Sequence, residues 1–157
     1  MRALCVPVLL SLPLLAAIAP ACAGDAAAPG LFDDRSAFEA IKALAGSWEG
    51  TASGSPKQPV AETFRLVAGG SVVEEDMFPG TPHEMLTMYH MDGDRLMLTH
   101  YCMAGNQPRL RFEKTGKPGV IRFAFDGGTN LKPETDDHMH EATFVLAKDR
   151  IEAEWVG

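Results

Sequence analysis

From residue 47 to the end of the chain, apolar and polar residues alternate with a period of two. Near the C-terminus, for example, Ile151, Ala153 and Trp155 alternate with Glu152 and Glu154. Successive side chains of a β-strand point to opposite faces, so this alternation is typical of strands that bury one face. The pattern therefore predicts an all-β domain with an apolar inner face and a polar outer face.

Turn-forming residues divide this region into nine segments. The predicted strands are residues 47–53, 60–68, 71–78, 84–91, 95–102, 108–114, 119–126, 138–147 and 150–156. Asp92-Gly93 predicts a two-residue hairpin turn, because both residues tolerate a positive φ. Such short connections predict an antiparallel meander of about nine to ten strands. Closure into a barrel is the usual way for so small a sheet to remove its exposed edges.

One short helix is expected before the strands, in the segment DDRSAFEAIKALAG. Ser36 and Glu39 fit a capping box, in which each side chain satisfies a backbone N–H at the helix start. Phe38 and Ile41 recur at helical spacing. Gly46 suits the left-handed position that ends a helix.

The N-terminus has the layout of a secretory signal peptide: Arg2, an apolar run, and small residues at Ala21 and Ala23. We expect cleavage after Ala23. The prediction is thus a signal peptide over 1–23, a flexible tether over 24–31 and one barrel domain over 32–157. Such a protein is periplasmic or secreted, with no transmembrane span in its mature form. A lipoprotein anchored through Cys22 is the alternative.

Composition limits the partners and the sources of stability. The formal net charge is −7, and an acidic chain is a poor partner for nucleic acid. Cleavage leaves Cys102 as the single cysteine, so no disulfide within the chain can form and the core must supply the stability. The sequence stops inside or just after the ninth predicted strand. Either this strand closes the barrel or the C-terminal end of the domain is truncated.

The stretch LAGSWEG, residues 44–50, resembles the start of the first strand in the calycin superfamily of lipocalins, fatty-acid-binding proteins and nitrobindin-like haem barrels. Gly46 and Trp48 match the Gly-x-Trp motif of these folds, and the resemblance implies that Trp48 packs across the closed end of a barrel. The stretches FPGTPHEM and LTHYC.AGNQPR are similar to exported bacterial lipocalin-like proteins of unassigned activity. The tyrosine-proline stretch of nitrobindins is absent, so the resemblance does not imply haem.

The stretch YHMDGDRLMLTHYC predicts the candidate site. An Asp92-Gly93 turn would place Tyr89 opposite Leu96, Met85 opposite His100 and His83 opposite Cys102. On that register Tyr89, His100 and Cys102 point inward. The face of Phe144, traced back along its strand, also points His140 and His138 inward.

A mostly apolar interior with a few hydrogen-bonding groups is typical of a ligand cavity. The predicted function is therefore binding of a small hydrophobic or amphipathic molecule, with Trp48 at the closed end. The acidic run Glu74-Glu75-Asp76 is expected to be a solvated strand edge or rim. The predicted ligand-binding residues are Tyr89, Leu98, His100, Cys102, Phe112, Phe123, His140 and Phe144.

Two alternatives remain open, although no cofactor is predicted. His100, His138 and His140, with nearby methionine sulfur and Cys102, could hold a metal such as copper or the iron of a haem. A small hydrolase or isomerase is the second alternative. Its only candidate nucleophile is Cys102 with His83 or His100, because the sequence lacks Gly-x-Ser-x-Gly and His-Glu-x-x-His motifs.

Overall fold

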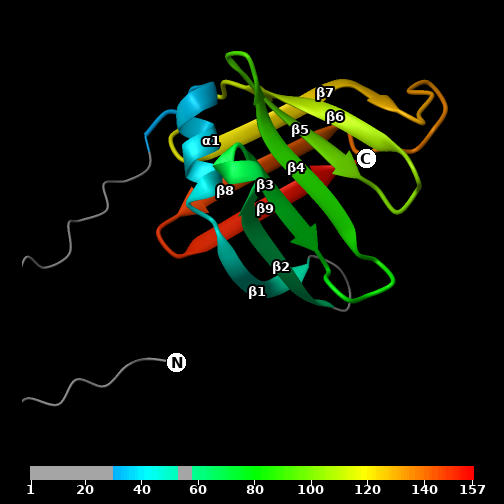
Figure 1. Cartoon of the computed structure of the whole chain (residues 1–157), viewed down its shortest axis with the longest axis horizontal. Coiled ribbons are helices and arrows are strands. Elements are labelled where there is room, and N and C mark those ends of the chain that lie inside the picture. The colour runs from blue at the N-terminus through cyan, green and yellow to red at the C-terminus, as the bar shows by residue number, and fades with distance from the viewer. Residues whose placement is uncertain (1–29, 53–57) are drawn as a thin grey trace, which may run out of the picture.

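The computed structural model describes residues 30–52 and 58–157. The predicted signal peptide, and the predicted tether up to residue 29, lie outside the described residues. In the described part, one α-helix precedes nine β-strands (Figure 1). The elements are α1 (Asp34–Lys42), β1 (Gly46–Ala52), β2 (Gln58–Val67), the 3₁₀ turn η1 (Ala68–Gly70), β3 (Val72–Met77), β4 (Met85–Asp92), β5 (Arg95–Tyr101), β6 (Gln107–Glu113), β7 (Val120–Thr129), β8 (Glu141–Ala147) and β9 (Arg150–Val156).

The strands form one antiparallel sheet in which each strand pairs with the next one in sequence. This meander confirms the predicted all-β fold class with one short N-terminal helix. The sheet curls into a half-barrel (Figure 1). In the part of the chain that the structure describes, β1 and β9 are edge strands and do not pair with each other. The predicted closure is therefore replaced by an open side between these two strands.

All nine predicted strands are present, and most boundaries agree to within two residues. Two boundaries differ by three residues: the seventh strand ends at Thr129 instead of residue 126, and the eighth begins at Glu141 instead of residue 138. His138 and His140 therefore precede β8. The inward direction predicted for these two side chains therefore rested on residues that lie outside the strand.

The turn between β4 and β5 lies one residue later than predicted. Asp92 pairs with Arg95, so Gly93 and Asp94 form the turn. Gly93 has a φ of 62°, whereas Asp94 is not among the residues with positive φ. A glycine at the first central position with ordinary φ at the second fits a type II′ turn, which matches the twist of the flanking strands. Each cross-strand pair therefore shifts by two residues, which leaves every side chain on its predicted face.

Helix α1 begins one turn earlier than the predicted capping box. Asp33 is the N-cap: its Oδ1 accepts a hydrogen bond from Ser36 N at 2.8 Å, and its own N–H donates to Ser36 Oγ at 2.9 Å. Gly46 begins β1 with a φ of 139° and does not end the helix. Asp34 Oδ1 accepts a hydrogen bond from Leu96 N at 2.9 Å, which fastens the helix to β5. Among the described residues, no helix is long and apolar enough to cross a membrane.

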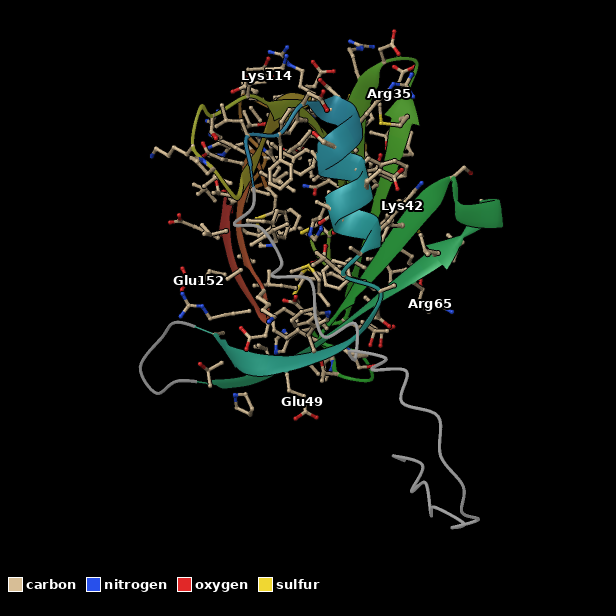
Figure 2. All side chains as sticks on the ribbon, turned by 90° about the vertical axis from the view of Figure 1, so that its left-hand side faces the viewer. Arg35, Lys42, Glu49, Arg65, Lys114 and Glu152 are labelled. Atoms are coloured by element: carbon tan, nitrogen blue, oxygen red, sulfur yellow. The ribbon has the colours of Figure 1, made fainter. Side chains whose placement is uncertain are left out.

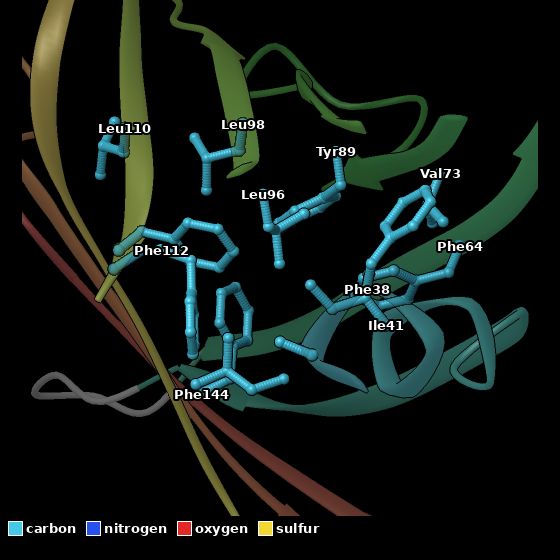
Figure 3. Packing of buried hydrophobic residues seen from close by; sticks show 14 residues of the cluster. Phe38, Ile41, Phe64, Val73, Tyr89, Leu96, Leu98, Leu110, Phe112 and Phe144 are labelled. Carbon is cyan, nitrogen blue, oxygen red and sulfur yellow. The ribbon is translucent and has the colours of Figure 1, made fainter. Parts of the chain in front are cut away.

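The concave side of the sheet holds a packed apolar core, to which α1 contributes Phe38 and Ile41 (Figure 3). Tyr89, Phe123 and Phe144 pack against one another with ring centroids 5.8–6.3 Å apart, the range of favourable tilted and edge-to-face contacts. Each large apolar side chain buried here contributes about 1.5–3 kcal/mol to folding. This core holds the curvature of the half-barrel and gives the open side its rigid back wall.

Candidate functional site

A cavity of about 540 Å³ lies at the open side of the half-barrel, between β1 and β2 on one side and β9 on the other. We call it the edge cavity. Its volume falls in the range of small-molecule binding sites. The lining residues are Trp48, Glu49, Gly50, Thr51, Ala52, Val60, Glu62, Met77, Phe78, Asp149, Arg150, Ile151, Ala153 and Trp155.

The two tryptophans of the chain both line the edge cavity. Trp48 Nε1 donates a hydrogen bond to Leu44 O at 2.8 Å, which fixes the indole of β1 to the segment after α1. Trp155, on β9, packs against Phe144 and His100, with ring centroids 5.9 and 5.0 Å away. Both indoles are therefore held in place by the fold and present rigid aromatic surface to the cavity.

Phe78 is a third aromatic residue of the lining and has an unusual backbone. Its φ is 56°, in the left-handed region that bulky residues rarely adopt. The backbone N–H of Phe78 donates to Ala61 O at 3.0 Å, and Thr81 N donates to Phe78 O at 3.2 Å. These bonds hold the strained residue where β3 ends, beside the cavity. Such local strain is often found at binding sites.

Behind the cavity lies a row of polar side chains, Glu75, Thr87 and His100, which we call the polar row. Glu75 pairs with Thr87 across β3 and β4, and Thr87 pairs with His100 across β4 and β5. All three are fully buried, with exposed fractions of 0%. Thr87 Oγ1 lies 3.0 Å from His100 Nδ1, and Tyr89 Oη donates to Glu75 Oε2 at 2.6 Å.

The polar row connects to the cavity through neighbouring side chains. Glu62 and Met77 form a cross-strand pair in the lining, and Glu75 precedes Met77 by two residues on the same face of β3. Trp155 is in the lining, and its ring contacts His100. The inner wall of the edge cavity is therefore the layer in front of Glu75 and His100.

Burial keeps the polar row uncharged at neutral pH. Burial and, to a lesser extent, the nearby carboxylate of Glu62 raise the pKa of Glu75 to about 8, although the hydrogen bond from Tyr89 lowers it. Burial also lowers the pKa of His100 to about 4. Glu75 is then mostly a carboxylic acid and His100 a neutral imidazole at pH 7. Two uncharged groups avoid the large penalty of buried charges.

Three atoms at this wall are buried without a hydrogen-bond partner among the residues that the structure describes: Glu75 Oε1, His100 Nε2 and Trp155 Nε1. A buried polar atom left unpaired destabilises the fold by about 1–3 kcal/mol. These three atoms therefore leave hydrogen-bonding capacity unused behind the surface of the cavity.

The structure places most of the predicted ligand-binding residues behind the edge cavity and not in its lining. Tyr89 and His100 are fully buried, as predicted, and Cys102 is half-buried. Leu98, Phe112, Phe123 and Phe144 belong to the packed core. The role of these residues in ligand binding stays a prediction.

His140 is exposed, unlike the inward position predicted for it. The register also removes Cys102 from its predicted position opposite His83, because Leu86 pairs with Tyr101. His100 lies opposite Thr87, and Cys102 Sγ accepts a hydrogen bond from Ala104 N at 3.5 Å.

Sequence reasoning missed the carboxyl groups of the site. Glu75 was expected to be solvated with Glu74 and Asp76, yet it is completely buried. The alternation of β3 held a usable signal, because Val73 and Met77 are in phase with Glu75. The equally apolar Val72 has the opposite phase, so the sequence alone left the inward face of β3 ambiguous.

Histidine and acidic side chains do not assemble into a metal site in the described residues: no group of three or more His, Cys, Asp or Glu side chains is placed to hold an ion. The ring centroids of His138 and His140 lie 6.0 Å apart, and His138 Nδ1 is 2.7 Å from Asp136 O. His138 also packs on Phe125 at 4.7 Å. These contacts give His138 a structural role in the connection before β8.

Comparisons of this chain with protein-family models, with curated proteins and with solved structures found no match.

Proposed function

We propose that this protein is an exported, lipocalin-like protein that binds a small hydrophobic or amphipathic molecule in the edge cavity. The observation that carries the proposal is a cavity of about 540 Å³ whose lining joins two indoles and apolar side chains to a buried polar row. A cavity that combines aromatic and aliphatic side chains with polar groups suits such ligands.

The resemblance of Gly46 and Trp48 to the calycin Gly-x-Trp motif supports the same proposal, as does the curled antiparallel meander. Calycins bind their ligands inside a curved sheet. Here the packed core fills the centre, so the ligand lies at the open side, between the edge strands.

Burial of apolar ligand surface would drive binding, at roughly 25 cal/mol per Å² before the entropy lost on association. The packed core behind the cavity favours affinity, because a preformed wall needs little reorganisation. Glu62 in the lining would orient the polar end of the ligand, with the polar row behind it.

Tryptophan fluorescence provides a direct test, because both tryptophans of the chain line the cavity. A neutral apolar probe such as N-phenyl-1-naphthylamine should quench or shift this fluorescence in a saturable way. Ala153→Phe adds bulk to the lining and should weaken probe binding about tenfold or more, a loss of at least 1.4 kcal/mol. Ala147→Phe adds the same bulk to an exposed position of β8 that is not in the lining and serves as the matched control.

Two outcomes would contradict the proposal: no saturable binding of any apolar probe, or equal binding by both variants. Native mass spectrometry of the protein from its own host, searching for a co-purifying small molecule, tests the same proposal independently. Absorbance and metal analysis of the same sample test the haem and metal alternatives, since a Soret band or bound metal would favour them.

A further inference from the structure

Two carboxyl groups share the inner wall of the edge cavity. Glu62 is half-buried in the lining and pairs with Met77, and Glu75 lies diagonally behind it on β3. Diagonal neighbours on one face of a sheet are about 7–8 Å apart, within reach of long side chains. Burial raises the pKa of Glu62, and both burial and the charge of Glu62 raise that of Glu75. The two carboxyl groups are therefore close enough for the charge of one to affect the ionisation of the other.

Within residues 30–52 and 58–157, basic side chains do not neutralise this wall. The charged residues of the lining are Glu49, Glu62, Asp149 and Arg150. Arg150 belongs to the start of β9, and its Nη2 lies 3.0 Å from Glu152 Oε1. The side chains of Glu49 and Glu152 point away from the body of the protein (Figure 2). The one basic residue of the lining thus already has an acidic partner at the outer rim.

The groups that face Glu75 from the packed strands are also free of positive charge at neutral pH. They are Glu62 from β2, Tyr89 from β4 and, beyond Thr87, His100 from β5. Glu75 Oε1 is fully buried and has no hydrogen-bond partner within the described residues. An unpaired oxygen in an acidic wall, with no cation beside it in the described part of the chain, is suited to a positively charged group of a ligand.

The indoles of Trp48 and Trp155 add a second attraction for the same chemistry. Tryptophan is the side chain that binds organic cations best, through the negative face of its ring. A carboxyl group beside aromatic rings is a common arrangement for recognising an ammonium group. A carboxylate head group would bind poorly, because Glu62 would repel it and no free basic side chain lies in the described lining.

Building on the ligand-binding function proposed above, we propose that the ligand is an organic cation: an apolar chain or ring system with an ammonium group that lies beside Glu62 and Glu75. The apolar part occupies the space between the edge strands and contacts Trp48 and Trp155. An ammonium group favours the ionised form of a nearby carboxyl group, so binding at neutral pH releases a proton from Glu75.

Three amphiphiles with the same chain and different head groups test this proposal: decyltrimethylammonium, decanol and decanoate, each below its micelle concentration. Displacement of N-phenyl-1-naphthylamine measures their affinities. We expect decyltrimethylammonium to bind at least about tenfold more tightly than decanoate, with decanol between them. The charge of the quaternary ammonium is independent of pH, so its affinity should rise from pH 6.5 to 8.5 as Glu75 ionises.

Glu75→Gln should weaken decyltrimethylammonium binding about tenfold and remove its increase with pH, without changing decanol binding. Glu141→Gln, on the outer face, is the matched control and should change neither. The inference is overturned if decanol or decanoate binds as tightly as the cation, or if the two variants behave alike. In those cases the proposed ligand-binding function stands. If the naphthylamine probe itself does not bind, the proposed function fails instead.

Discussion

Two pairs of glutamates on opposite faces of the same sheet have opposite electrostatic surroundings. On the outer face, Arg122 forms ion pairs with Glu113 and with Glu141, the latter at 2.7 Å, and these contacts lower the pKa of Glu141. On the inner face, Glu62 and Glu75 have no arginine or lysine partner among the described residues, and their pKa values are raised.

The difference shows what each pair can do. The outer pair is a solvated, compensated network, of the kind that contributes little to stability. The inner pair keeps an unsatisfied oxygen and an unfavourable charge balance beside a cavity. Strongly shifted carboxyl groups of this kind tend to mark functional sites, because stability alone gives no reason to retain them.

Among the residues compared, replacing Glu75 should cause the largest change in the free energy of unfolding. The folded protein raises the pKa of Glu75 from 4.5 to about 8, so between these values the folded state binds more protons than the unfolded state. Glu75 therefore lowers stability as pH rises through this window. Relative to Glu75→Gln, the wild-type free energy of unfolding should fall by about 4–5 kcal/mol between pH 4.5 and 8.

Urea unfolding at several pH values measures this difference. Glutamine keeps an oxygen that accepts the hydrogen bond of Tyr89, so the variant isolates the titration of the carboxyl group. A difference between the two proteins that does not change with pH would mean that Glu75 is ionised in the folded state.

Replacing His100 should reveal the opposite pH dependence, with a smaller size. The folded protein lowers the pKa of His100 from 6.5 to about 4, so between these values the unfolded state binds more protons. Wild-type stability relative to His100→Phe should therefore rise by about 3 kcal/mol from pH 4 to 6.5. Phenylalanine keeps an aromatic ring against Trp155.

Unfolding of the two proteins across this pH range is the measurement. Between pH 4.5 and 6.5 the titrations of His100 and Glu75 change the free energy of unfolding in opposite directions. Glu75→Gln in the His100→Phe background should therefore show the contribution of Glu75 alone. A wild-type advantage that stays constant from pH 4 to 6.5 would show that His100 takes up a proton as easily when folded as when unfolded.

The outer pair should give the smallest effect. Glu141→Gln leaves Arg122 paired with Glu113. The side chains of Arg122, Glu113 and Glu141 are each about one-third exposed. We expect a loss of roughly 0.5 kcal/mol that shrinks at high salt. The pKa of Glu141 is lowered, so this contribution is present at neutral pH and is lost as pH falls below the ordinary range of a glutamate. Urea unfolding at low and high salt checks it, and a loss of several kcal/mol would erase the contrast between the two faces.

The sequence by itself determined the elements of this fold. Alternation and turn chemistry are local properties, so residues near one another in the chain were enough to predict nine strands and one helix. The same alternation placed Tyr89 and His100 on the inner face. The two-residue error at the turn after Asp92 left that result intact, because side chains repeat every two residues.

Only the tertiary structure decided where the cavity lies and which side chains reach it. The curl of the sheet depends on all nine strands together, and it left β1 and β9 apart on either side of the open cavity. Burial of Glu75 depended on the phase of β3 against its neighbours, which Val72 and Val73 leave open locally. His140 is exposed, although the alternation of the neighbouring strand predicted an inward position for it. Contacts between distant segments set each of these outcomes, and a local pattern does not contain them.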